Sequence, residues 1–87
     1  MARIYYRKTE FGDGVVARIV GVHDWGEGDT REEARACLRE TAETSAEFFT
    51  ECADKLSPVQ RKEQVARLKV LGELGWKLPA GAAAPST

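Results

Sequence analysis

Residues 26–40, GEGDTREEARACLRE, decide the fold of this chain, because a glycine-rich segment runs directly into a charged, alanine-rich one. Two glycines separated by one residue predict a tight turn. Asp29 and Thr30 are both good helix caps, and Thr30 followed three residues later by Glu33 forms a capping box. We therefore expect a turn that leads into a helix. The residues expected to fix this entry are Gly28, Asp29, Thr30 and Glu33.

The predicted helix is long and amphipathic. It is expected to run for about 26 residues, or about 39 Å, and to end before Ser57-Pro58. A strand of about eight residues spans only about 25 Å, so the helix should project past its sheet and its bulky late residues should need another cover. Small and apolar residues recur at spacings of three and four along one stripe, which comprises Ala34, Cys37, Leu38, Thr41, Ser45, Phe48, Phe49, Cys52 and Leu56.

Strands are expected before the glycine segment, over residues 3–10 and 15–22, with a hairpin loop at 11–14 and a short third strand at 23–25. The predicted fold class is α+β: an antiparallel β-meander of two or three strands packed on a long amphipathic helix, plus a second, C-terminal helix. Side chains alternate between the two faces of a strand. The wholly apolar face of the second strand, which should meet the core, is formed by Val15, Ala17 and Ile19.

A second helix is predicted over residues 58–74, because Ser57-Pro58 is a typical helix start and Gly72 and Gly75 can end it. Its apolar residues form two edges, so we expect one edge to contact the first helix and the other a second copy of the chain. A strand over 65–71 is the alternative. The residues expected at the interface between copies are Phe48, Phe49, Leu56, Val65, Leu68 and Leu71.

The chain is expected to form a single domain over residues 1–79, with a core at about 3–56 and a helical extension at 57–79. Residues 76–79 are expected to pair briefly as an edge strand. The low-complexity segment 80–87 is expected to be a flexible tail.

Composition indicates an ordinary soluble globular protein, with 43% hydrophobic residues, 31% charged residues and a net charge of −1. No apolar run approaches the about eighteen residues of a membrane span, and the N-terminus lacks an apolar signal core. We therefore expect a cytoplasmic protein with no membrane contact. A chain of 87 residues buries only a modest core, which favours a homo-oligomer. The charge lacks the basic footprint of DNA-binding proteins, although residues 61–69 offer an alternative phosphate contact.

No catalytic residue, metal site or cofactor is expected. The chain has one histidine, His23, and its two cysteines, Cys37 and Cys52, would lie about 22 Å apart on one helix, too far for a disulfide. A metal-dependent hydrolase built on Asp24 or Asp29 is an alternative. Turn and cap roles account for these two carboxylates more simply.

The hairpin and the helix entry together resemble the HicB family of small antitoxin-type proteins. The similarity rests on residues 11–20 and on the string Gly28-Asp29-Thr30-x-Glu32-Glu33-Ala34-x-Ala36. It implies a partial ribonuclease H-like core that binds and masks a small, mRNA-cutting toxin of the HicA type. Full-length members add a DNA-binding helix-turn-helix or ribbon-helix-helix. Residues 57–79 resemble neither, and residues 20–24 replace the family's usual proline-glycine segment.

We therefore expect an HicB-like antitoxin or a related binding protein of a type II toxin–antitoxin system, acting by protein–protein interaction. If the helix covers one face of the sheet, the other face or the edge strand is left for a partner, by face packing or β-augmentation. The alternatives are a small ribonuclease H-like hydrolase and a nucleic-acid-binding regulator. The residues expected to contact the partner are Tyr5, Arg7, Val16, Arg18 and Trp25.

Overall fold

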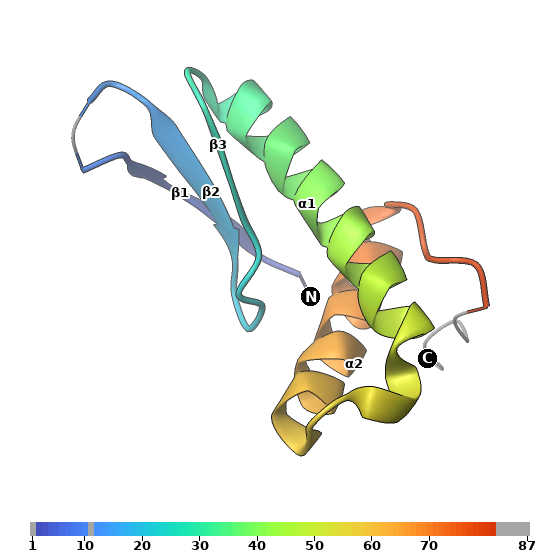
Figure 1. Cartoon of the computed structure of the whole chain (residues 1–87). Coiled ribbons are helices and arrows are strands. Elements are labelled where there is room, and N and C mark those ends of the chain that lie inside the picture. Colours follow the sequence, from blue (N-terminus) through green and yellow to red (C-terminus); the bar gives the residue numbers. More distant parts are fainter. Residues whose placement is uncertain (1, 11, 82–87) are drawn as a thin grey trace.

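The computed structural model of this protein describes residues 2–10 and 12–81, which form a three-stranded sheet followed by two α-helices (Figure 1). The strands are antiparallel and lie in the order β1-β2-β3. The predicted α+β class, with a meander, a long first helix and a C-terminal helix, is confirmed. The elements are β1 (Ile4–Lys8), β2 (Val15–Ile19), β3 (Trp25–Gly28), α1 (Arg31–Glu51), the 3₁₀ helix η1 (Ala53–Lys55) and α2 (Pro58–Leu74).

The glycine segment is strand β3, so the turn predicted there is wrong. Gly26 lies opposite Ala17 of β2, and neither Gly26 nor Gly28 has a positive φ. Both glycines face α1 at very short range. A Cβ on Gly26 would lie 2.2 Å from the backbone nitrogen of Leu38, and one on Gly28 would lie 2.5 Å from the Cβ of Glu33. Glycine is needed here because the helix backbone approaches the strand closely, and not because the chain turns.

Both strands of the hairpin are shorter than predicted. β2 ends at Ile19, and Gly21 then turns the chain with a φ of 86°. β3 starts at Trp25, later than the short third strand expected from the sequence. Ala17 and Ile19 are buried and Val15 is half-buried, so the predicted core face of β2 is confirmed.

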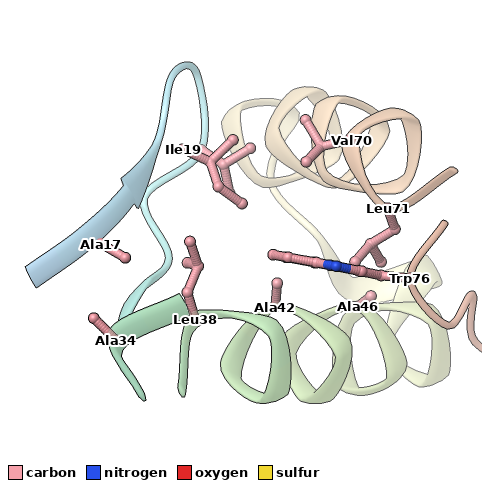
Figure 2. Packing of buried hydrophobic residues seen from close by; sticks show 10 residues of the cluster. Ala17, Ile19, Ala34, Leu38, Ala42, Ala46, Val70, Leu71 and Trp76 are labelled. Carbon is pink, nitrogen blue, oxygen red and sulfur yellow. The ribbon is translucent and has the colours of Figure 1, made fainter. Parts of the chain in front are cut away.

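The core lies between the sheet, one line of α1 side chains and the C-terminal part of the chain (Figure 2). The α1 line has a residue every four positions, three of them alanine, which lets the strand and α2 come close. The residues of this line are Ala34, Leu38, Ala42 and Ala46. The buried residues that pack around them include Ala17, Ile19, Val70, Leu71 and Trp76.

The buried line of α1 differs from the predicted stripe, which shares only Ala34 and Leu38 with it. The buried line has a strict spacing of four, whereas the predicted stripe alternated spacings of three and four. Ala34 and Leu38 face β3, while Ala42 and Ala46 lie beside Trp76 (Figure 2). The helix also ends at Glu51, earlier than predicted. The short 3₁₀ helix η1 follows it and ends at Lys55, two residues before Ser57. Residues of the predicted stripe that are only half-buried are Cys37, Thr41, Ser45, Phe49, Cys52 and Leu56.

Thr30 is the N-cap of α1. Its backbone is extended, and its hydroxyl accepts a hydrogen bond of 3.1 Å from the amide of Glu33. The Glu33 carboxylate meets the Thr30 hydroxyl at 3.3 Å. The predicted N-cap at Thr30 is confirmed, but the predicted capping box is only half formed, because the Glu33 carboxylate accepts from the Thr30 hydroxyl and not from the Thr30 backbone amide.

Replacing Thr30 by alanine is expected to lower the free energy of unfolding by about 1 kcal/mol, because one amide of the first helical turn loses its partner. Urea denaturation of wild type and variant at unchanged m-value measures the difference. Thr30→Ser keeps the hydroxyl and should stay close to wild type. Equal losses in both variants would contradict the capping role.

Helix α2 spans Pro58–Leu74 as predicted, which rules out the alternative strand. Ser57 caps it in a complete capping box with Gln60, and Gly75 ends it with a φ of 71°. The predicted edge of Val65, Leu68 and Leu71 is not available to a second copy as a whole, because Leu71 is fully buried while Val65 is 68% exposed. No helix among the described residues combines the length and apolar character that crossing a membrane requires.

The segment after α2 packs on α1 and does not form the predicted edge strand. Trp76 is only 6% exposed, and the Arg35 guanidinium lies 5.4 Å from the centre of its ring. The amide of Lys77 donates a hydrogen bond of 2.8 Å to Glu43. Burial raises the pKa of the Glu43 carboxyl, but this bond and the guanidinium of Arg39 outweigh it and lower the pKa overall. Of the predicted tail, residues 82–87 lie outside the described residues.

Candidate binding surface

The face of the sheet turned away from α1 carries the residues expected to contact a partner. Ile4 and Tyr6 pack against the core. Because successive side chains of a strand point to opposite faces, Tyr5 and Arg7 point to the other face. Tyr5 lies opposite Arg18, and Arg18 lies opposite Trp25, which makes one row across all three strands. The neighbouring row is Arg7, Val16 and Glu27. We call these two rows the open face.

Both helices lie on the opposite side of the sheet from the open face (Figure 1). Tyr5 is 40% exposed and Trp25 is 46% exposed, while Arg7 and Arg18 are also exposed. Large aromatic side chains are usually covered, so two of them in one uncovered row indicate a contact surface.

The charge of the open face is mainly positive. Arg7 and Arg18 are its basic residues and Glu27 its acidic one. Arg3 adds a third arginine next to the open face. The carbonyl of Arg3 accepts a hydrogen bond from the amide of Val20, so the chain is paired here too, and the alternation of side chains places Arg3 on the same face as Tyr5. Within the described residues, ion pairs involve His23, Arg39 and Arg67, so these three arginines are not neutralised by a paired carboxylate. A hollow on this face reaches from Tyr5 to the rim of the hairpin.

The structure therefore brings together all five residues expected at the partner surface, on one face and in register. Their role in binding stays a prediction. Glu27 was not among the expected residues because its strand was taken for a turn.

The residues expected between copies of the chain do not form one surface. Leu71 is buried inside the chain and Leu68 packs against the core, so Leu71 cannot contact a second copy. Phe48 is 58% exposed and meets Phe49 edge to face at 5.3 Å between ring centres. Phe49 is half-buried beneath Arg67, whose guanidinium carbon lies 5.1 Å from the ring centre. The chain thus shelters one phenylalanine and leaves the other exposed.

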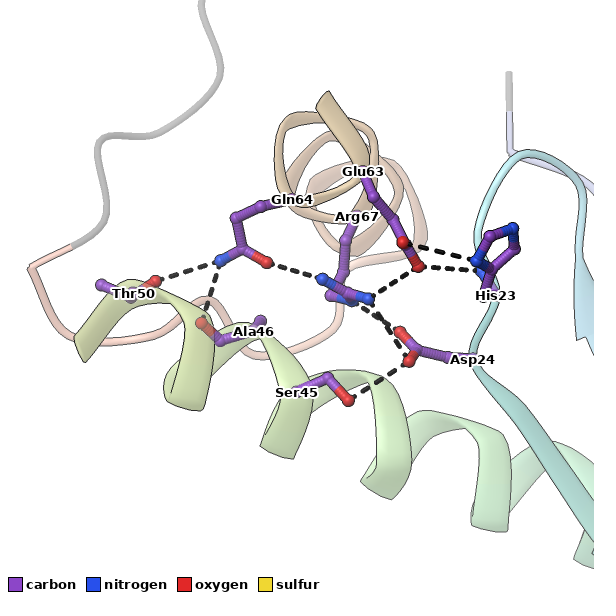
Figure 3. A network of polar contacts seen from close by, with 8 residues as sticks. All are labelled: His23, Asp24, Ser45, Ala46, Thr50, Glu63, Gln64 and Arg67. Carbon is purple, nitrogen blue, oxygen red and sulfur yellow. Dashed lines mark hydrogen bonds and ion pairs between the residues drawn. The ribbon is translucent and has the colours of Figure 1, made fainter. Parts of the chain in front are cut away.

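A polar network fills the space where α1, α2 and the loop before β3 meet (Figure 3). Its centre is Arg67, which is only 2% exposed. The Arg67 Nε donates to Asp24 Oδ2 at 2.6 Å, Nη1 donates to Gln64 Oε1 at 2.7 Å and Nη2 donates to Glu63 Oε1 at 3.1 Å. The hydroxyl of Ser45 donates to the same Asp24 carboxylate at 3.2 Å.

Two further contacts extend this network to the backbone. The Gln64 side-chain amide donates to the carbonyl of Ala46 at 3.0 Å, and the amide of His23 donates to Glu63 Oε1 at 3.1 Å. Among the described residues, no buried side-chain nitrogen or oxygen lacks a hydrogen-bond partner. The network joins three parts of the chain that are distant in sequence, and its chemistry is that of a structural clamp.

The clamp gives a structural role to a carboxylate that the alternative hydrolase hypothesis would use. Asp24, one of its two candidate carboxylates, is held by Arg67 and Ser45. Asp29 is exposed, just before the N-cap of α1. Among residues 2–10 and 12–81, no three His, Cys, Asp or Glu side chains lie close enough together to hold a metal ion. Cys37 and Cys52 are half-buried free thiols.

The basic residues of α2 separate into two groups. Arg67 belongs to the clamp, whereas Arg61, Lys62 and Lys69 are exposed. From the sequence, residues 61–69 were considered as an alternative phosphate contact, and the clamp was missed. The available signal was the position of Arg67 and Gln64 among the apolar residues of the helix.

Comparisons of the chain with protein-family models, with curated proteins and with solved structures find no significant match. The likeness to the HicB family therefore rests on the residues of the hairpin and helix entry.

Proposed function

We propose that this chain is an HicB-like antitoxin, or a related binding protein, that acts by protein–protein interaction. The observation that carries the proposal is a small sheet with one face covered by α1 and the other uncovered, bordered by the free edge of β1. The order of a hairpin, a third strand and a capped helix also agrees with the order of elements in that family. A small toxin-like protein is the proposed partner.

The proposed contact runs along β1, which pairs with β2 on one side only. An extended segment of the partner can add a strand at this edge, because the edge offers unpaired backbone groups. Tyr5 and Arg7 project from β1 onto the open face and would anchor the partner from there. Tyrosine and arginine are among the residues most enriched at the energetic centres of protein interfaces.

Self-association stays a prediction. Phe48 and Val65 are exposed and provide apolar surface for it, while Leu71 does not. Sedimentation of the purified chain over a range of concentrations measures it directly.

Co-expression with candidate small toxins tests the proposed function. Wild type should restore growth that the toxin stops. The double variant Tyr5→Ala and Arg7→Ala should bind the toxin at least about thirtyfold more weakly. This factor corresponds to a loss of about 2 kcal/mol of binding free energy, as expected for residues at the energetic centre of an interface. The matched control is Arg61→Ala with Lys62→Ala, two exposed residues on α2. It should restore growth as wild type does.

Two results would contradict the proposal. One is that no candidate toxin is bound or neutralised by a chain that is folded by circular dichroism. The other is that the α2 control loses rescue while the β1 variant keeps it, because binding would then lie on the exposed face of α2.

A further inference from the structure

The central row of the open face continues from Tyr5, at the β1 edge where the proposed protein partner binds, across β2 to Trp25 on β3. Tyr5 and Trp25 stand on the two outer strands, with Arg18 between them on β2. Neighbouring strands lie about 5 Å apart, so the two aromatic residues are rooted about 10 Å apart. At this spacing the rings of Tyr5 and Trp25 can each stack on a separate planar group, and the Arg18 guanidinium lies between them.

Other aromatic–arginine pairs in the chain are already formed within it. Arg31 lies over Tyr6, Arg35 over Trp76 and Arg67 over Phe49, at 5.1 to 5.4 Å from the ring centres. Among the described residues, the cation–π contacts do not include Tyr5, Trp25 or Arg18. With Tyr5 40% and Trp25 46% exposed, both residues keep part of their surface accessible to a ligand.

The charge around this row fits an anionic ligand. Arg7 borders Tyr5 on the same strand, and Arg3 lies beyond it. On the open face Glu27 is the opposing charge, in the row next to Arg18. Arg18 at the centre of the row is exposed and forms no ion pair within the described residues, so an anionic ligand can approach it.

We propose that the open face binds single-stranded nucleic acid, with bases stacked on Tyr5 and Trp25 and phosphates held by Arg7 and Arg18. Bases stack on exposed aromatic side chains without regard to sequence, and arginines along the path hold the backbone. The inference goes beyond the proposed function and does not depend on a toxin partner. Duplex nucleic acid does not fit, because its bases are already stacked and cannot reach the rings.

Trp25 reports on binding directly. It is 46% exposed, whereas the second tryptophan, Trp76, is buried, so quenching of fluorescence by an oligonucleotide measures Trp25. Fluorescently labelled oligo-U and oligo-dT of equal length, and a duplex of the same length, are titrated with the full chain at about 50 mM salt and at higher salt. Similar affinities for oligo-U and oligo-dT would show that the site recognises base stacking and phosphate charge, which single-stranded RNA and DNA have in common. A clear preference for oligo-U would assign the site to RNA. Either result supports the proposal.

Variants separate stacking from charge. Trp25→Ala should weaken binding of the labelled oligonucleotide about tenfold, within the range for loss of one stacked base, while Trp25→Phe should stay within about threefold of wild type. Arg18→Ala should lower the slope of log affinity against log salt by about 0.7, and Arg18→Lys should preserve it. Arg61→Ala with Lys62→Ala should change neither quantity.

Three results would overturn the inference. They are the absence of saturable binding to oligo-U and oligo-dT, equal or tighter binding of the duplex, and binding that depends on Arg61 and Lys62 but not on Trp25. Toxin neutralisation without oligonucleotide binding would leave the proposed function standing and refute this inference. Oligonucleotide binding without toxin neutralisation would support this inference and contradict the proposed function.

Discussion

Gly26→Ala is expected to lower the free energy of unfolding by about 3 kcal/mol or more, the upper part of the range for overpacked sites. A methyl group there would lie 2.2 Å from the backbone nitrogen of Leu38 and 2.6 Å from the carbonyl oxygen of Ala34. Ordinary contacts of a Cβ start at about 3.4 Å, so α1 would have to move away from β3 by more than 1 Å. Because the Leu38 nitrogen and the Ala34 oxygen belong to the helix backbone, such a movement shifts α1 as a whole and opens the core along its buried line of side chains.

Urea denaturation followed by circular dichroism measures this loss. A domain of this size has a total stability of about 4–13 kcal/mol, so the variant should be largely unfolded at moderate urea concentrations that wild type resists. The matched control is Gly72→Ala. Gly72 is an exposed residue inside α2, with no atom within 4 Å of an added Cβ, and this change should stabilise the chain by about 0.5–1 kcal/mol. Full stability of Gly26→Ala would contradict the close packing of α1 on β3.

Arg67→Met is the second change with a large expected effect, a loss of about 3–5 kcal/mol. Methionine fills similar space but leaves the Asp24 carboxylate, 10% exposed, without its cation. Gln64 and Glu63 lose a partner in the same step. Breaking one side of a buried ion pair is costly because the remaining charge stays in a poorly solvated place.

The control for this change is Arg39→Met. Arg39 pairs with Glu43 at 3.1 Å on the exposed surface of α1, and the loss should be about 0.5 kcal/mol or less. The double variant Asp24→Asn with Arg67→Met should recover part of the stability, because no unpaired carboxylate remains at Asp24. Equal effects of Arg67→Met and Arg39→Met would show that the network is not a clamp. A double variant as unstable as the sum of its parts would show that the two residues are not coupled.

Part of the binding surface followed from the sequence and part did not. The alternation of β1 and β2 placed Tyr5, Arg7, Val16 and Arg18 together, because a strand has only two faces and the apolar one must meet the core. Their relation to Trp25 and Glu27 needed the register of β3, a strand that continues from Trp25 through the segment predicted to turn. The predicted interface between copies failed at Leu71 because the C-terminal part of α2 packs into the core, where Val70 and Leu71 are buried, while Val65 nearer its start stays exposed.

The sequence by itself determined the features whose partners lie within a few residues. Thr30 and Ser57 cap their helices through amides three residues away, and Gly75 ends α2 through its own backbone conformation. Tertiary structure decided the features whose partners are distant. Gly26 is required because α1 lies against it, and Arg67 is buried because Asp24, 43 residues earlier, meets it there. Local hydrogen bonds are available in any chain carrying those residues, whereas close backbone contacts and buried charges are stable only once the other elements have packed around them.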